Sequence, residues 1–292
     1  RRDDYVRLMQ KMGIHTGGIR ASHFSSLTLE DRDRILSYIF FNGKTTLDKV
    51  EELFDLYVEF LTEYEFNNPR RLVEILRSEK ADMESSLVPS GNHYISLRLQ
   101  SYGSCIGRYD ELTGGIAYFK FLRNLLESAE KKPDEIANRF RSVAEKILTR
   151  NNLLVNITSE ASDYKRFEKR LNDLFERFPD QSLERANLSF EEPVKNEAFP
   201  TASAVQYVGK GVNLYHLGFE YSGCFEVVKA IINTGYLWEN VRMRGGAYGC
   251  SASFDYYSGD FGLVSYRDPN LKETLQTYDG VEGFLRNLTL PK

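Results

Sequence analysis

The sequence has few of the residues that most often hold metal ions. Its 292 residues include three cysteines and only four histidines, which are His15, His23, His93 and His216. The odd cysteine count and the lack of a C-x-x-C spacing argue against a disulfide framework or a thiolate zinc site, and suit a reducing compartment. Neither H-E-x-x-H nor H-x-x-E-H occurs. We therefore expect this chain alone to bind no metal.

Signals for several other functions are also missing. No apolar run approaches the roughly 20 residues that a membrane span needs. The net charge is -4 with acids and bases interspersed, which argues against nucleic acid or a membrane as partner. There is no Walker A loop and no G-x-S-x-G elbow, and we interpret residues 209–211 (Gly-Lys-Gly) as a tight turn. The sequence leaves open a catalytic Cys–His pair, but no feature supports one.

Apolar and aromatic side chains are plentiful. Hydrophobic residues make up 41% and charged residues 27%, as is normal for a globular chain with a sizeable core. There are 18 tyrosines and 19 phenylalanines against one tryptophan. Aromatic side chains build cores, and they also line surfaces that bind peptides.

The hydrophobic pattern predicts a mixed α+β chain. Helices are expected over 5–12, 47–61, 69–87, 112–126, 133–148, 164–178, 224–233 and 270–288. Strands are expected over 35–41, 153–157, 204–208, 214–219, 250–255 and 261–266. Thr45 with Asp48, and Asn68 before Pro69, are typical helix starts, and Asp268 is placed to cap the last helix.

The chain is long enough for two domains. We expect an α+β region over 1–180 with a helical insertion, a proline-bearing linker over 181–200, and a partial α+β region over 201–292. Glycine-containing turns at 15–22 and 244–249 each precede strands and a packing helix, which indicates two homologous domains with antiparallel sheets. The first copy would lack its early strands and the second its final part, and the chain starts Arg1-Arg2 without a methionine or signal peptide, so we expect both domains to be truncated.

Residues 236–249, YLWENVRMRGGAYG, form the most distinctive stretch. The glycine pair lets a backbone pass close to a neighbour or ligand. The phenol of Tyr248 is suited to an oxyanion, and the guanidinium of Arg242 to a peptide carbonyl. From these residues alone, ordinary structural roles are the favoured interpretation.

The same stretch resembles the C-terminal half of presequence-protease-type peptidases, in the pitrilysin and insulin-degrading superfamily of zinc proteases. Residues 15–19 (HTGGI), 207–211 (YVGKG) and 265–270 (SYRDPN) are similar as well, and all the matches fall in the family's order. The resemblance covers essentially the whole chain. It assigns residues 68–131 to the helical region of this branch, and the turn that begins at His15 is interpreted as structural.

The resemblance implies a zinc metalloendopeptidase of four homologous α+β domains, whose two halves close around unfolded peptides. The zinc ligands lie in the N-terminal half, so the metal would be a cofactor of the full-length enzyme held outside this chain. This chain would be the substrate-clasping fragment, inactive without that partner half. Arg242 and Tyr248 have the family's spacing of five intervening residues. The resemblance makes them catalytic and substrate-binding, with Arg242 on a substrate carbonyl, Tyr248 on the oxyanion and Gly246 beside the peptide.

Two alternatives remain at this point. One is a non-catalytic structural or peptide-binding subunit of the same fold, which would not need to keep Arg242 and Tyr248. The other is an aromatic-rich α+β protein with unrelated ligands, which the ordered matches disfavour. For the peptidase we expect a cytoplasmic location, or an organelle matrix if the source is eukaryotic.

Overall fold

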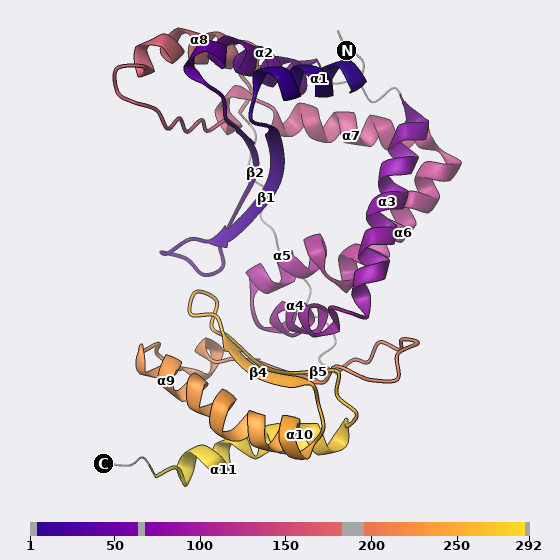
Figure 1. Cartoon of the computed structure of the whole chain (residues 1–292), viewed down its shortest axis with the longest axis vertical. Coiled ribbons are helices and arrows are strands. Elements are labelled where there is room, and N and C mark those ends of the chain that lie inside the picture. The colour runs from indigo at the N-terminus through magenta and orange to yellow at the C-terminus, as the bar shows by residue number, and fades with distance from the viewer. Residues whose placement is uncertain (1–4, 64–67, 183–195, 290–292) are drawn as a thin grey trace. The chain divides into compact units, whose positions relative to one another are not determined.

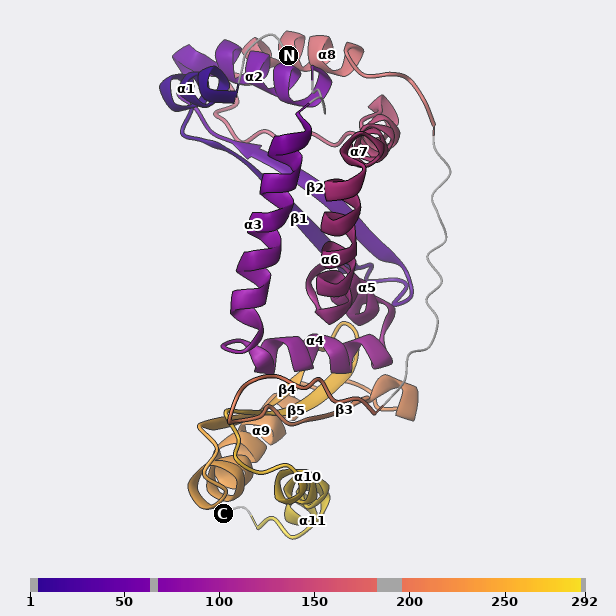
Figure 2. The ribbon, with the colours of Figure 1, turned by 90° about the vertical axis from the view of Figure 1, so that its right-hand side faces the viewer.

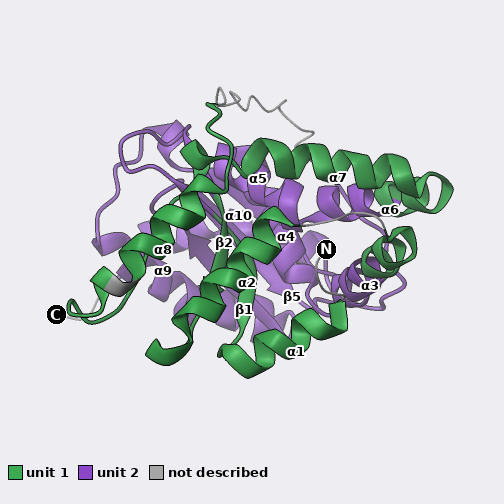
Figure 3. Ribbon diagram, turned by 90° about the horizontal axis from the view of Figure 1, so that it is seen from above, with its two compact units in different colours: residues 1–24, 38–77, 124–188 green, residues 25–37, 78–123, 189–292 purple. Residues whose placement is uncertain are grey.

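The computed structural model describes residues 5–63, 68–182 and 196–289. They form helices and two small antiparallel sheets, which confirms the mixed α+β class (Figure 1). The chain divides into two compact units (Figure 3). Unit 1 comprises residues 1–24, 38–77 and 124–188, and unit 2 comprises 25–37, 78–123 and 189–292. The predicted domain boundaries and the homology of the two domains stay predictions.

Unit 1 is mainly helical. Its helices are α1 (Tyr5–His15), α2 (Val50–Thr62), α7 (Pro133–Ile147) and α8 (Tyr164–Glu176). The hairpin of β1 (Ile19–Leu27) and β2 (Ile35–Gly43), together with α3 (Pro69–Leu87) and α6 (Ile116–Lys131), contributes residues to both units. The core between α2 and α8 contains the buried side chains of Leu61, Leu174 and Phe178. The predicted strand over 153–157 is wrong, because these described residues pair with no other strand.

Helix α1 continues through Gly13 to His15, three residues beyond the predicted end at residue 12. Side chains from the following turns satisfy its last carbonyl groups, which otherwise lack partners. The hydroxyl of Thr16 donates to Met12 O at 2.7 Å, and Lys49 Nζ donates to Ile14 O at 2.8 Å. Thr45 donates to His15 O at 2.8 Å, and the N-cap of the next helical segment is Thr46 without a side-chain capping bond, so the predicted capping box is not formed. These contacts give the turn after His15 a structural role.

Unit 2 is built around a three-stranded antiparallel sheet in the order β3-β5-β4 (Figure 1). The strands are β3 (Gly209–Asn213), β4 (Gly249–Phe254) and β5 (Asp260–Tyr266). Helix α9 (Cys224–Ile231) continues directly into η4 (Ile232–Arg244), a π-type helix, and α10 (Lys272–Asp279) and α11 (Val281–Arg286) follow the sheet. One sheet face and these helices enclose the main core, which includes Leu237, Val241, Ala252, Leu263 and Tyr278.

The other face of this sheet is covered by α4 (Gly91–Gly103), which α5 (Cys105–Gly114) follows (Figure 2). The close packing favours glycine on β3, because a Cβ atom at Gly209 would collide with the side chain of Ile95 and lie 2.8 Å from that of Leu99. The sequence did not predict α4 at all, and it merged α5 and α6 into one helix over 112–126. The break falls at Gly115, where a Cβ atom would collide with the carboxylate of Glu111.

Four further predictions in unit 2 need correction. Residues 209–211, interpreted as a tight turn, form the first part of strand β3. Residues 204–208 form only an isolated bridge, between Gln206 and Asp268, and not a strand. Residues 214–219 contain the short 3-10 helix η3 (Tyr215–Leu217), which ends at Gly218 with a φ of 82°. The helix expected over 270–288 is interrupted at Gly280, against which the hydroxyl of Tyr236 packs. The two predicted strands of the β4–β5 hairpin are confirmed.

A buried carboxylate joins α4 to α5. Glu111 is fully buried and accepts hydrogen bonds from the backbone of Ala117 at 2.9 Å and from Arg98 at 3.4 Å. Arg98 also donates two hydrogen bonds to Glu197, at 2.5 and 2.7 Å. Burial raises the pKa of the Glu111 carboxyl above its ordinary value, and the contacts with Ala117 and Arg98 offset this only in part.

Glu111→Gln should therefore change how stability depends on pH. A carboxyl whose pKa is higher in the folded state holds its proton more tightly when folded, so its contribution to stability declines as pH rises above its unfolded pKa of 4.5. The glutamine variant lacks this decline. We expect its free energy of unfolding in urea, relative to that of the unmodified protein, to increase as the pH rises above 4.5 and to level off once the carboxyl is ionised in the folded state as well. The exposed-site control Glu282→Gln should show no such trend, and a relative stability that falls with pH would contradict the expectation.

Candidate functional site

The predicted site residue Arg242 lies on helix η4. The helix widens at its C-terminal end, where the N–H of Gly245 donates to the carbonyl of Asn240, five residues earlier, at 3.1 Å. Such π-type turns are rare and occur frequently at functional sites. Leu237 and Val241 are buried against the sheet. The residues that follow each of them, Trp238 and Arg242, lie on a more exposed flank of the helix.

The guanidinium of Arg242 rests on aromatic rings. It lies 4.0 Å from the ring centroid of Trp238 and 5.9 Å from that of Tyr248. No described residue forms an ion pair or a hydrogen bond with this guanidinium. Arg244, in contrast, pairs with Glu239 at 3.2 Å and donates to Asn240 at 3.4 Å. The N–H donors of Arg242 are thus available to a ligand, whereas the guanidinium of Arg244 already has an anionic and an amide partner.

The glycine pair turns the chain from η4 into β4. Gly246 has a φ of 78°, which favours glycine over other residues. The N–H of Gly246 donates to Arg242 O at 3.0 Å, and Asn270 Nδ2 donates to Gly245 O at 2.5 Å. The turn is thereby fixed on both sides. It connects the three residues predicted as a site, Arg242, Gly246 and Tyr248, which lie in one short segment of the chain.

Tyr248 follows this turn and projects into solvent. Its N–H donates to Arg267 O at 3.3 Å, while its side chain is 66% exposed. The hydroxyl makes no hydrogen bond with any described residue. The edge-to-face contact with Tyr266, at 5.6 Å between ring centroids, supports the ring from one side. An exposed phenol beside an unpaired guanidinium can donate hydrogen bonds to a polar ligand.

Asp268 supports the same turn in a way that differs from the prediction. It is fully buried, and its carboxylate accepts hydrogen bonds from Asn270 N at 2.9 Å and from the Thr274 hydroxyl at 2.8 Å. The N-cap residue of α10 is Leu271, so Asp268 is not the helix cap. Its role is to hold the loop that carries Asn270 against the glycine pair.

The sequence interpretation missed Trp238 and Tyr266 as neighbours of the site. Trp238 precedes Arg242 by four residues, a spacing that brings side chains together on one face of a helix. The sequence predicts a helix only over 224–233, however, whereas the structure continues it through η4 to Arg244. Tyr266 contacts Tyr248 because the pairing of β4 with β5 places Tyr266 opposite Gly249, the residue that follows Tyr248.

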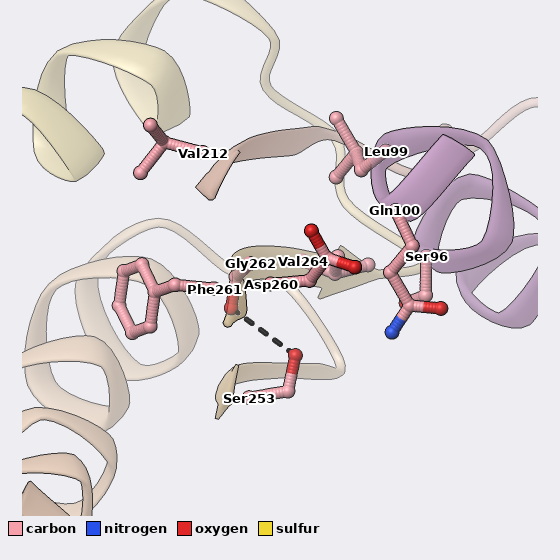
Figure 4. Close-up of a pocket in the computed structure, with 9 residues that line it drawn as sticks. All are labelled: Ser96, Leu99, Gln100, Val212, Ser253, Asp260, Phe261, Gly262 and Val264. Atoms are coloured by element: carbon pink, nitrogen blue, oxygen red, sulfur yellow. Dashed lines mark hydrogen bonds between the residues drawn. The ribbon is translucent and has the colours of Figure 1, made fainter. Parts of the chain in front are cut away.

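A small cavity lies between α4 and the sheet (Figure 4). Ser96, Leu99 and Gln100 line it from α4, and strand residues including Ser253 and Gly262 line it from the other side. Its volume is about 10 Å³, which suffices for one water molecule. We therefore assign this cavity to packing and not to binding of a peptide.

The residues that the structure describes do not fit a zinc site. Within the described part of the chain, no three His, Cys, Asp or Glu side chains are grouped so that they could hold a metal ion. No helix in that part is long and apolar enough to cross a membrane.

Comparison with known proteins identifies the family. Residues 1–125 match the family model "Peptidase M-16C associated", and residues 196–291 match "PreP C-terminal domain". The chain is 33% identical over 285 residues to presequence protease 1, chloroplastic/mitochondrial, of Arabidopsis thaliana. It is 30% identical over 284 residues to Protein HypA of Clostridium perfringens, and 28% identical over 277 residues to the mitochondrial presequence protease of Yarrowia lipolytica.

The alignments cover 97% of the chain for the first two relatives and 93% for the third. They cover only 26%, 29% and 28% of the Arabidopsis, Clostridium and Yarrowia proteins. The class is therefore that of the M-16C peptidases. The chain belongs to the presequence protease family and corresponds to its C-terminal region.

Proposed function

We propose that this chain is the substrate-clasping part of a zinc metalloendopeptidase that degrades unfolded peptides inside a chamber formed by two halves. The observation that supports it best is the pairing of Arg242, which has no anionic partner among the described residues, with the exposed phenol of Tyr248. A scaffold protein has no need for such a pair. Membership of the presequence protease family supports the peptidase class.

Each residue of the site has a distinct proposed role. Arg242 donates hydrogen bonds to a backbone carbonyl of the peptide and so fixes its register. Tyr248 donates its phenol proton to the oxygen that becomes negative when the scissile carbonyl is attacked. Gly246 leaves room for the peptide backbone, since a Cβ atom there would meet only Pro269, at 3.7 Å.

Bound zinc would supply an activated water molecule and polarise the scissile carbonyl. We assign its ligands to the N-terminal half of the protease, outside this chain, and expect this chain alone to be inactive. The partners are then unfolded peptides and that half, in the cytoplasm or in an organelle matrix. The cheapest check is the coding sequence connected to this chain, in which an H-x-x-E-H motif is expected; a non-catalytic subunit would lack it.

The matched pair Arg242→Ala and Arg244→Ala tests the site in the complete protease proposed to contain this chain. A charge-assisted hydrogen bond is worth about 1.5–3 kcal/mol, so we expect Arg242→Ala to lower kcat/KM by roughly 10- to 100-fold. Arg244→Ala removes only an exposed pair with Glu239 and should change kcat/KM by less than about twofold. Equal losses in the two variants would contradict the role of Arg242.

A further inference from the structure

Trp238 has a position that core packing does not explain. It is the only tryptophan of the chain, and it is 47% exposed although the preceding Leu237 is completely buried. Because the ring is only half covered by the core, one of its faces is accessible to a cation. The group it contacts here is the guanidinium of Arg242, 4.0 Å from the ring centroid.

The chemistry of this contact differs from that of an ion pair. A carboxylate or amide oxygen approaches a guanidinium in its plane and occupies N–H donors, as Glu239 and Asn240 do for Arg244. An aromatic face attracts the cation electrostatically without accepting its N–H groups, and tryptophan is the strongest such partner. Trp238 can therefore hold Arg242 in place and leave its donors for a peptide carbonyl.

The helix segment that carries Trp238 is firmly attached to the rest of unit 2. Tyr236 donates a hydrogen bond to Thr277 O at 2.9 Å, and its ring lies 4.9 Å from that of Phe284. The side chain of Asn233 bonds both the N–H and the C=O of Ala252, at 2.6 and 3.1 Å. With Leu237 buried as well, the backbone that carries the indole ring is anchored, so the ring can fix a flexible arginine.

From these contacts we propose that Trp238 is a positioning residue for Arg242. It restricts the guanidinium to one location by a cation–π contact and keeps its N–H donors directed at the substrate. This inference rests on the proposed function of Arg242, but the contact itself can be tested without any turnover.

The first test uses the fluorescence of Trp238 in the 292-residue chain, where no other tryptophan emits. Arg242→Met removes the cation that covers one face of the indole ring. We expect the acrylamide quenching constant to rise by roughly twofold in Arg242→Met and to stay unchanged in Arg244→Met. Equal quenching constants in Arg242→Met and the unmodified chain would overturn the proposal.

The second test measures kcat/KM in the complete protease. Trp238→Leu should lower it by roughly two- to fivefold, and Trp238→Phe, which keeps an aromatic face, should recover most of the loss. In an Arg242→Ala background, Trp238→Leu should have no further effect, because the ring then has nothing to position. Met243→Ala, at a 63% exposed residue of the same helix, should behave like the unmodified enzyme.

The outcomes separate the two proposals. Equal losses in Trp238→Leu and Trp238→Phe, or additive losses with Arg242→Ala, would overturn the positioning role. If Arg242→Ala itself leaves kcat/KM unchanged, the proposed function of Arg242 fails, whereas the quenching experiment still decides whether the cation–π contact exists.

Discussion

Tyr248→Phe lowers the kcat of the complete protease by roughly 100-fold, with little change in KM, if the phenol acts as proposed. Removal of one hydrogen-bond donor from an oxyanion site typically costs about 100- to 1,000-fold in kcat. The loss falls on kcat because the oxygen is negatively charged only after attack, so the bond is stronger in the transition state than in the ground state. Steady-state kinetics with a fluorogenic peptide measure both parameters.

Tyr257→Phe is the matched control for this experiment. Tyr257 is also exposed, at 48%, but it lies past the far end of β4 and has no contact with Arg242. Its kcat should stay within about twofold of the unmodified enzyme. A Tyr248→Phe variant with unchanged kcat, or with a loss confined to KM, would exclude the oxyanion role and leave at most a role in peptide binding.

Leu237→Ala has the largest expected effect on stability. Leu237 is 0% exposed and lies in the main core of unit 2, beside Val241, Ala252 and Leu263. Truncation of a buried leucine loses its transfer free energy and leaves a cavity, which together cost about 3 kcal/mol and up to about 5 kcal/mol. We expect the free energy of unfolding, measured in urea at neutral pH, to fall by this amount.

The same substitution at Leu217 provides the control, because that side chain is 71% exposed. Leu217→Ala should change the free energy of unfolding by less than about 0.5 kcal/mol. Similar values for the two variants would show that helix η4 is not anchored through Leu237, and the fixed placement of Trp238 and Arg242 would lose its basis.

The sequence predicted those elements whose apolar residues follow the period of one kind of secondary structure. Helix α7 carries Ile136, Phe140 and Val143 at helical spacing, and the β4–β5 hairpin shows the strand pattern. Helix α4 has no such pattern: Ile95 and Leu99 pack on the sheet while Tyr94 and Ser101 are also buried, so its apolar residues do not form one stripe.

The errors in unit 2 have a common physical cause, which is that short apolar runs do not distinguish strand from helix or turn. Residues 214–219 contain enough apolar and aromatic side chains for a strand, but the positive φ of Gly218 and the hydrogen bond from Phe219 N to Leu214 O close them into a turn. In η4, the wide turns of a π-type helix and the interior Gly235 depart from the pattern of an ordinary helix.

The site itself was predicted from a resemblance and not from chemistry alone. The spacing of Arg242 and Tyr248 matches the family, whereas their residue types and positions alone favour structural roles. The structure adds physical reasons for that choice: Arg244 is engaged by Glu239, and Arg242 rests on Trp238. The contact between Tyr248 and Tyr266 depends on strand register, which no local pattern reveals.

Photo-crosslinking tests most directly whether Tyr248 touches the peptide. p-Benzoylphenylalanine is placed at position 248 or, in a matched variant, at position 257 of the complete protease, and each variant is irradiated with a labelled peptide whose scissile bond resists hydrolysis. We expect labelled protein only from position 248, at a yield that falls when Arg242→Ala is added. Labelling at both positions alike, or at position 257 alone, would contradict the placement of the substrate beside Arg242 and Tyr248.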